Sequence, residues 1–281
     1  MIPDWETNCV YFSRLLGEQY PDLLERLTQI LRSHKVEVRL LEGTKDIWAR
    51  DYCPVQIEAN RFLKFRYDPD YLKEDKYRHL VTGDEVIEQL RDLGAIEKSE
   101  IVLDGGNVVT SGRLVVLTDK VFQENPKRRR RNLQQELAGL LGAEGCIIIP
   151  TEPLDYIGHA DGVVRFLTEN LVVVNDYKGM DRSYRCRLHR ALARHGLEVI
   201  PCPSWVSDMT RKGIASAVGN YVNFLRVGNL VMLPAYEDQR DEKARRALEQ
   251  ADLGLTIVPV LCRNLAEKGG VLQCVSWTVK R

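Results

Sequence analysis

The sequence predicts an α/β fold built from five repeated units of hairpin, helix and strand. The first observation is a repeat: a strand, a tight polar turn and a second strand recur about every 56 residues, a spacing typical of repeated supersecondary units. The second is that helical patterns and short apolar strands fill the intervals between the hairpins. The third is that a polar or reactive residue opens each unit.

The units follow one another along the chain. The clearest hairpins span 106–117, 162–174 and 219–233, and their turns are rich in residues that tolerate hairpin backbone angles. A weaker hairpin spans 51–65, and a fifth unit starts at 269, where the chain end cuts its strand short. We expect helices at 22–31, 132–141, 184–195 and 242–253, each followed by a strand, at 36–40, 146–149, 197–200 and 255–258.

Chemically useful side chains open these units at the same place in each. If the units share an axis, the openings converge on one central cavity. No linker long enough to separate domains interrupts the cycle, so we expect residues 1–281 to form a single catalytic domain. The residues at the openings are Asp51, Asp104, His159 with Asp161, Asn220 with Asn223, and Cys274.

Composition narrows the class of protein. The chain has 281 residues and 44% hydrophobic content, with 40 basic and 40 acidic residues, so its balance does not favour nucleic acid or membrane partners. The basic run at 127–131 is interpreted as a solvated loop before a helix. Residues 1–6 lack the features of a signal peptide, which predicts a cytoplasmic protein. Seven scattered cysteines with no Cys-x-x-Cys pair disfavour disulfides and structural zinc.

The residue types at the openings indicate nucleophilic catalysis. His159 and Asp161 are two residues apart, and on an extended strand they would face the same side. Cys274 follows the pair Gly269-Gly270, which lets backbone approach closely and leaves the thiol accessible. A thiol, an imidazole and carboxylates together suit a nucleophile with a proton carrier. Zinc would need more nitrogen or sulfur ligands, so no metal or other cofactor is expected.

The carboxylates also indicate the substrate. Fixed carboxylates would repel an anion but would match a planar guanidinium through paired hydrogen bonds. We therefore expect Asp51 and Asp161 to hold a guanidinium and Cys274 to attack its central carbon. His159 would protonate the departing nitrogen and later deprotonate the hydrolytic water.

Five motifs, in order along nearly the whole chain, resemble those of the agmatine deiminase and bacterial-type peptidylarginine deiminase family. The resemblance implies the five-bladed α/β propeller called the pentein fold, a covalent thiouronium intermediate on Cys274, and release of ammonia to leave a ureido product. It assigns Asp51 and Asp161 to the guanidinium and His159 to acid/base work. Two departures are Cys53 in place of Gly and Gln273 in place of His. The motifs are Trp48-Ala49-Arg50-Asp51-Tyr52-Cys53-Pro54, Asp104-Gly105-Gly106-Asn107, Gly158-His159-Ala160-Asp161-Gly162-Val163-Val164-Arg165-Phe166, Asn220-Tyr221-Val222-Asn223-Phe224 and Gly269-Gly270-Val271-Leu272-Gln273-Cys274.

Further residues are candidates for substrate binding, three of them with two interpretations. Trp48 lines the substrate channel or packs in the core. Asp155 faces the cation or caps a turn, and Arg165 pairs with an active-site carboxylate or makes a surface salt bridge. The other candidates are Asp104, Asn107 and Asn223.

Several functions fit this chemistry, with deimination of agmatine to N-carbamoylputrescine first. The alternatives are a peptidyl- or free-arginine deiminase giving citrulline, an amidinotransferase or methylarginine hydrolase of the same fold, and a catalytically silent guanidine-binding protein. The expected partners are a small guanidino substrate and water, without nucleic acid or membrane, and the outer faces of the units are candidates for a homodimer. The segment 208–213 is a candidate lid.

Overall fold

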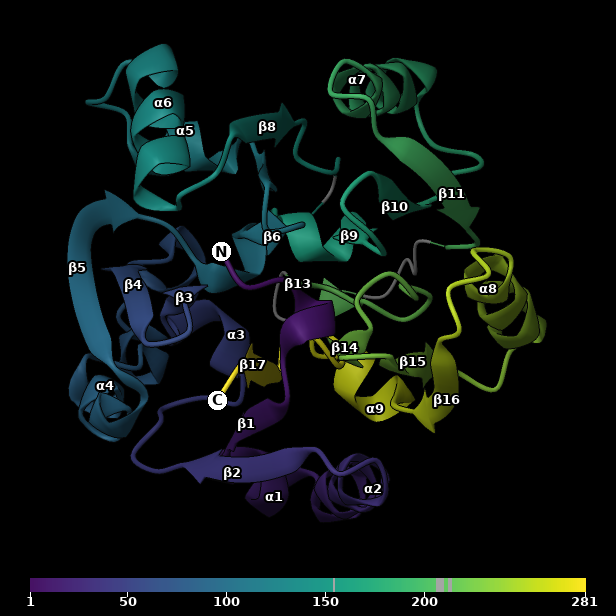
Figure 1. Ribbon diagram of the computed structural model, residues 1–281, viewed down its shortest axis with the longest axis horizontal. Coiled ribbons are helices and arrows are strands. Elements are labelled where there is room, and N and C mark those ends of the chain that lie inside the picture. Colours follow the sequence, from purple (N-terminus) through teal and green to yellow (C-terminus); the bar gives the residue numbers. More distant parts are fainter. Residues whose placement is uncertain (154, 206–209, 212–213) are drawn as a thin grey trace.

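The computed structural model describes residues 1–153, 155–205, 210–211 and 214–281. In this part of the chain, five three-stranded sheets lie around a common centre, and the longer helices lie outside them (Figure 1). We call each sheet with its helices a blade. This arrangement confirms the predicted pentein propeller. Most of the candidate lid at 208–213 lies outside the described residues.

Each blade contains one antiparallel pair and one parallel pair of strands. In the fourth blade, for example, β9 (Val164–Phe166) pairs antiparallel with β10 (Leu171–Asn175), and β10 pairs parallel with β11 (Glu198–Cys202). The parallel third strand requires a crossover, which a helix supplies. The remaining blades are the first, β17 (Ser276–Val279), β1 (Cys9–Ser13) and β2 (Glu37–Leu41); the second, β3 (Val55–Glu58), β4 (Arg61–Arg66) and β5 (Ala95–Val102); the third, β6 (Val109–Thr110), β7 (Leu114–Thr118) and β8 (Gly145–Ile149); and the fifth, β14 (Leu225–Val227), β15 (Leu230–Ala235) and β16 (Thr256–Leu261).

The crossover helices form where a capping residue is followed by apolar residues at helical spacing. In α8 (Gln239–Glu249), Asp238 and Asp241 form a capping box, and Ala244 and Leu248 are buried. The predicted helices are confirmed with ends shifted by one to four residues. The helices are α1 (Arg14–Gln19), α2 (Pro21–Ser33), α3 (Ala49–Tyr52), α4 (Glu85–Glu88), α5 (Lys120–Glu124), α6 (Arg130–Leu140), α7 (Arg182–Ala193), α8 and α9 (Arg263–Ala266).

The remaining elements are short. A two-stranded sheet is formed by β12 (Thr210–Arg211) and β13 (Ile214–Ala215). The 3₁₀ turns are η1 (Asp4–Glu6), η2 (Asp70–Leu72), η3 (Arg78–Leu80), η4 (Arg91–Leu93), η5 (Gly105–Asn107) and η6 (Ala160–Gly162).

The first blade is closed by both ends of the chain, which the repeat did not predict. The fifth repeat is not cut short: β17 pairs antiparallel with the N-terminal strand β1, and β1 pairs parallel with β2. The predicted strand at 269–274 is wrong, because the strand starts at Ser276 after a turn. Periodicity alone could not find this pairing, since its two strands are at opposite ends of the chain.

The predicted opening strands are also too early in three blades. Gly105–Asn107 and Ala160–Gly162 form 3₁₀ turns, and strands start only at Val109, Val164 and Leu225. These glycine-containing segments therefore turn at the centre of the ring before the chain enters each blade. Strand β5 (Ala95–Val102), which is partly polar and exposed, was not predicted. Among the described residues, no helix is both long and apolar enough to cross a membrane.

Candidate functional site

A cavity of about 200 Å³ lies at the centre of the ring, at the ends of several blades. Its volume is suited to a small molecule. The structure brings together seven of the ten candidate residues as lining of this cavity. They are Trp48, Asp51, Asp155, His159, Asp161, Asn223 and Cys274.

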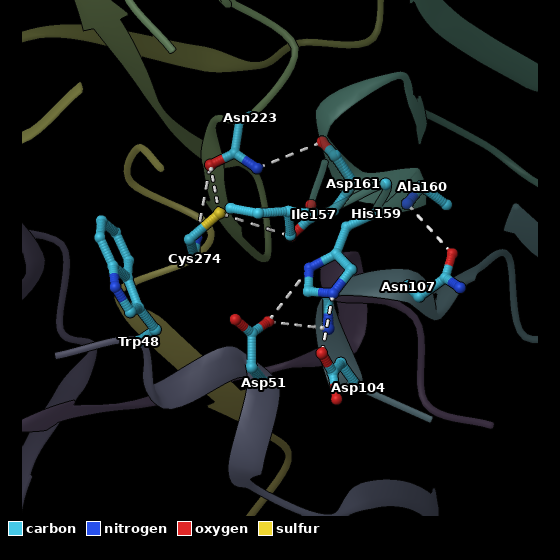
Figure 2. Close-up of polar contacts among 12 residues, drawn as sticks. Trp48, Asp51, Asp104, Asn107, Ile157, His159, Ala160, Asp161, Asn223 and Cys274 are labelled. Atoms are coloured by element: carbon cyan, nitrogen blue, oxygen red, sulfur yellow. Dashed lines mark hydrogen bonds and ion pairs between the residues drawn. The ribbon is translucent and has the colours of Figure 1, made fainter. Parts of the chain in front are cut away.

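Cys274 is partly exposed to this cavity and is held by Asn223 (Figure 2). Its thiol donates to Asn223 Oδ1 at 3.3 Å, and its backbone N–H donates to the same oxygen at 3.3 Å. The Asn223 Nδ2 in turn donates to the carbonyl of Asp161 at 3.3 Å. The Sγ lies 3.9 Å from Asp161 Oδ2. The asparagine thus links the thiol to the carboxylate segment of the fourth blade.

His159 is buried between two carboxylates (Figure 2). Its Nε2 lies 3.1 Å from Asp104 Oδ2, and its Nδ1 lies 3.5 Å from Asp51 Oδ1. Burial alone would lower the pKa of His159, but the charges of Asp51, Asp104 and Asp161 outweigh burial and raise that pKa to about 10. An imidazolium in this position can donate a proton to a group in the cavity.

Gly106 allows the imidazole and the Asp51 carboxylate to approach each other. Its backbone N–H donates to Asp51 Oδ1 at 3.2 Å. A Cβ on this residue would lie 2.5 Å from Asp51 Oδ1 and 2.5 Å from His159 Nδ1. The glycine is required here by close approach and not by an unusual backbone angle.

Burial disfavours the charged forms of the carboxylates that face the cavity. The side chains of Asp51 and Asp161 are both buried, and burial raises the pKa of each above its ordinary value. For Asp51, the neighbouring aspartates raise it further, while His159 lowers it. A bound cation would relieve this repulsion.

The thiol of Cys274 responds to the same charges. Burial raises its pKa well above the ordinary value, and the negative charges of Asp161 and Asp51 raise it further. With the cavity free of a cation, the cysteine is therefore a protonated thiol near neutral pH.

Trp48 and Asp155 each combine their two predicted interpretations. Trp48 lines the cavity and also packs on the main apolar core, and only a glycine at position 270 leaves room for its ring, because a Cβ there would lie 2.5 Å from Trp48 Cζ3. Asp155 lines the cavity while its Oδ1 accepts a hydrogen bond from Ile157 N at 2.9 Å, which stabilises a turn.

Three candidates do not line the cavity. Asp104 lies behind His159 and also accepts a hydrogen bond from Tyr71 at 3.2 Å. Asn107 connects two backbone segments: its Oδ1 accepts hydrogen bonds from Thr118 N and Ala160 N at 2.9 and 3.2 Å. The surface interpretation of Arg165 is wrong, because this residue is buried, and its direct ion-pair partner is Asp4, which does not line the cavity.

The extended strand expected to align His159 with Asp161 is not formed, because Ala160–Gly162 form a 3₁₀ turn. Both side chains nevertheless reach the cavity, because the turn lies at the centre of the ring.

Sequence reasoning missed several lining residues. Burial raises the pKa of Asp46 and of Glu152 to about 7 in each case. Glu152 accepts a hydrogen bond from Tyr177 at 2.5 Å, and Trp205 lies on the same cavity. The position of Asp46, five residues before Asp51, was the only available signal. The described residues hold no cluster of three or more His, Cys, Asp or Glu side chains that would suit a metal ion.

Comparison with known proteins places the chain in a family. A family profile described as Porphyromonas-type peptidyl-arginine deiminase matches residues 16–279. The chain belongs to this family. Among the curated relatives, the agmatine deiminase of Stutzerimonas stutzeri is 23% identical over 287 residues, covering 85% of this chain and 76% of the relative.

Solved structures share the fold. A substrate-bound cysteine-to-serine variant of the C. jejuni agmatine deiminase superposes with a TM-score of 0.79 at 17% identity, covering 100% of this chain and 96% of that one. An amidinotransferase from Microseira wollei superposes with a TM-score of 0.63 at 13% identity, covering 100% and 96%. At these identities the likeness establishes the family's five-bladed fold.

Proposed function

We propose that this protein is a cysteine hydrolase that acts on the C–N bonds of linear amidines, with agmatine as its substrate and N-carbamoylputrescine and ammonia as products. Residues 1–281 act as one catalytic domain in this proposal. The observation that carries it is a single cavity with a thiol on one side, a buried imidazole on another and two buried carboxylates between them. Membership of the deiminase family supports the same chemistry.

The carboxylates of Asp51 and Asp161 hold the guanidinium through charge-assisted hydrogen bonds. Burial and the charges of these carboxylates keep the Cys274 thiol protonated. The cation neutralises the charges, so its binding lowers the pKa of the thiol and favours release of the thiol proton. Substrate binding and activation of the nucleophile are thereby coupled.

The reaction then has two halves. In the first, the Cys274 thiolate forms a bond to the guanidinium carbon, His159 donates its proton to one amino nitrogen, and the C–N bond breaks to release ammonia. This leaves a cationic thiouronium on sulfur and a neutral imidazole. In the second, His159 takes a proton from water, the oxygen bonds to the same carbon, and the C–S bond breaks. The remaining hydroxyl proton passes to solvent as the carbonyl forms, and the thiolate is restored; the guanidinium cation and water have then become the neutral ureido product, ammonia and one proton.

The charge of the lining supports a substrate with a second cationic group. Beyond the two carboxylates assigned to the guanidinium, Asp46, Glu152 and Asp155 line the cavity, and among the described lining residues Lys268 is the one lysine or arginine. A substrate with a distal ammonium would complement this surface, whereas the α-carboxylate of free arginine would be repelled.

A short polar chain connects Glu152 to the guanidinium end. Asn175 Nδ2 donates to the Gly162 carbonyl at 2.8 Å and lies 3.4 Å from the Tyr177 hydroxyl, which donates to Glu152 at 2.5 Å. Gly162 directly follows Asp161. These contacts join Glu152, which lines the cavity, to the segment that carries Asp161.

The test is release of ammonia and of ureido product from agmatine, free arginine, a peptide with C-terminal arginine and a methylated arginine, with the Cys274→Ala protein as blank. We expect turnover of agmatine above the other three. Turnover of another substrate alone would correct the tail specificity. Silence on all four by a folded protein would refute the deiminase and favour an amidinotransferase, whose acceptor the assay lacks, or a binding protein.

The state of the cysteines indicates the cellular compartment in which the protein works. All seven are free thiols, and buried free thiols are usual in a reducing compartment. We propose that the enzyme works in the cytoplasm.

A further inference from the structure

Two buried arginines join the fourth and fifth blades in a reciprocal way. Arg165 lies on β9 of the fourth blade, and its Nη1 donates to the carbonyl of Phe224 in the fifth-blade segment at 2.6 Å. Arg226 lies on β14 of the fifth blade, and its Nη1 donates to the carbonyl of Leu167 in the fourth blade at 2.7 Å. Each arginine therefore binds the backbone of the other blade.

The N-terminal segment covers this pair. Asp4, in η1, forms an ion pair with Arg165, and its carbonyl accepts a hydrogen bond from Gly228 N at 3.0 Å. The Arg226 guanidinium carbon lies 5.2 Å from the centre of the Trp5 ring. In Figure 1 the N-terminal ribbon crosses the middle of the ring of blades, in agreement with these contacts.

A third arginine, partly buried, lies beside this cluster. Arg50, directly before Asp51, donates its backbone N–H to the Cys274 carbonyl at 3.1 Å and its Nη2 to Thr278 Oγ1 at 3.2 Å. Its buried Nε has no hydrogen-bond partner among the described residues. Arg50 and Arg165, with Asp4, line a small polar cavity that is distinct from the substrate cavity.

Holding these cations in the interior is costly. Burial lowers the pKa of Arg226 to about 10, and burial also lowers the pKa of Arg50. Apolar side chains of similar volume would bind the blades together without this penalty. The charges therefore call for a reason beyond packing.

That reason lies in the segment on which Arg165 stands. Arg165 follows Asp161 by four residues, and the carbonyl that it binds belongs to the residue after Asn223, which contacts both the thiol and the Asp161 carbonyl. Burial raises the pKa of Asp161, whereas His159, Arg165 and Arg50 lower it. The positive charges of Arg165 and Arg50 thus oppose the effect of burial on Asp161.

We propose that Arg165, fixed by Asp4 of the N-terminal segment and assisted by Arg50, is a positioning residue that keeps Asp161 ionised and aligned with Asn223 for binding of a cationic substrate. The carboxylate of Asp4 limits the excess positive charge that these three arginines would otherwise leave. This inference rests on the proposed function for the role of Asp161, but its test does not depend on turnover.

The test compares Arg165→Met with Arg165→Lys. The measured quantity is the ratio of the rates at which 2-chloroacetamidine, a cation, and 2-chloroacetamide, which is neutral, alkylate Cys274, followed by mass spectrometry from pH 4.5 to 9 (roughly the interval in which a buried carboxylate titrates). Because both reagents attack the same thiol, the ratio reports the negative charge beside it. Arg113→Met, which removes an exposed arginine paired with Glu144, is the control.

In Arg165→Met, we expect the pH at which the cationic preference is half lost to rise by about one unit, because Asp161 loses a nearby positive charge. Arg165→Lys should keep that pH within about 0.3 unit, and Arg113→Met should leave the whole profile unchanged. Equal loss of preference in the Met and Lys variants, without a shift along the pH axis, would show a purely structural role and overturn the proposal.

A second variant covers the case in which Arg165→Met does not fold. Asp4→Asn keeps the shape of the N-terminal segment but removes its negative charge, so Asp161 should stay ionised to a lower pH and the half-loss point should fall. An unchanged or higher point in folded Asp4→Asn protein would contradict the proposal. If the protein turns over none of the four guanidino compounds, but Arg165→Met raises and Asp4→Asn lowers the pH at which the cationic preference is half lost, the proposed reaction is refuted and the effect of Arg165 on the charge of Asp161 stands.

Discussion

Replacing Gly106 by alanine tests the arrangement of the acid/base pair directly. The added Cβ would lie 2.5 Å from Asp51 Oδ1 and 2.5 Å from His159 Nδ1. Ordinary van der Waals contact begins at about 3.4 Å, so each atom must move by about 0.9 Å or the η5 turn must shift. His159 cannot move freely, because Asp104 holds its other nitrogen at 3.1 Å.

The expected cost is mainly kinetic. A displacement of about 1 Å in a catalytic group lowers the rate by about 100-fold, so we expect kcat/KM for agmatine to fall by about two orders of magnitude. The hydrogen bond from Gly106 N to Asp51 would weaken, with a loss of about 1 kcal/mol of stability. The fold should survive, since the neighbouring atoms are side-chain ends and the backbone angle suits alanine.

The assay measures ammonia release across agmatine concentrations, with thermal unfolding of the same preparations. Gly139→Ala is the matched control, because this exposed glycine of α6 has no atom within 4 Å of an added Cβ. It should keep full activity and gain about 0.5–1 kcal/mol of stability. A folded Gly106→Ala enzyme with near-normal kcat/KM would refute the reasoning that Asp51 and His159 must stay in contact.

Three further predictions concern individual charges. Asp51→Asn, made in the Cys274→Ser protein to prevent turnover, should weaken agmatine binding by about 10 to 100-fold in calorimetry, because the amide keeps the shape but loses the charge; unchanged affinity would exclude Asp51 from the guanidinium site. Burial raises the pKa of the Asp46 carboxyl to about 7, whereas its pKa in the unfolded chain is about 3.9. The folded protein therefore binds the carboxyl proton more tightly than the unfolded chain does, and the contribution of Asp46 to the free energy of unfolding falls as the pH rises from about 4 to 7. Asp46→Asn should remove that decline and add about 2–4 kcal/mol at pH 8, with the hydrogen bond from Trp48 N retained, as measured by urea unfolding at pH 5 and 8. Because neighbouring carboxylates raise the pKa of His159 to about 10, kcat/KM should decline only as pH passes about 10, and a decline near pH 7 would contradict its charged state.

The repeat was sufficient to predict the units of hairpin, helix and strand, because their patterns are local. The amphipathic pattern of α2 and α8 and the apolar run of β8 are local properties, readable from neighbouring residues. The closure of the first blade could not be predicted from neighbouring residues, since β1 and β17 meet only when the ring is complete. That pairing is a consequence of the topology and leaves no mark on the period of the repeat.

The site was predictable to the extent that chemistry limits residue type. Cys274, His159 and Asp161 were identified because few residues can act as nucleophile, proton carrier and anion. The roles of Asn107 and Arg165 were not, because an asparagine whose oxygen accepts two backbone N–H groups has the same letter in the sequence as one that faces a ligand. Whether a polar side chain faces inward to a cavity or bridges two blades depends on contacts more than 50 residues away.

The buried carboxylates also explain how the cysteine can be both accessible and unreactive. A partly exposed thiol at low pKa would react with any electrophile. Here burial raises the pKa of the Cys274 thiol, and the charges of Asp161 and Asp51 raise it further; these carboxylates are also the groups best placed to attract a cation. A bound positive charge cancels their part of the effect, so the carboxylates contribute both to the selectivity for a guanidinium and to the protection of the thiol. Any change that lowers the charge at Asp161 should then weaken both together: binding of the cation and the resistance of the thiol to neutral reagents.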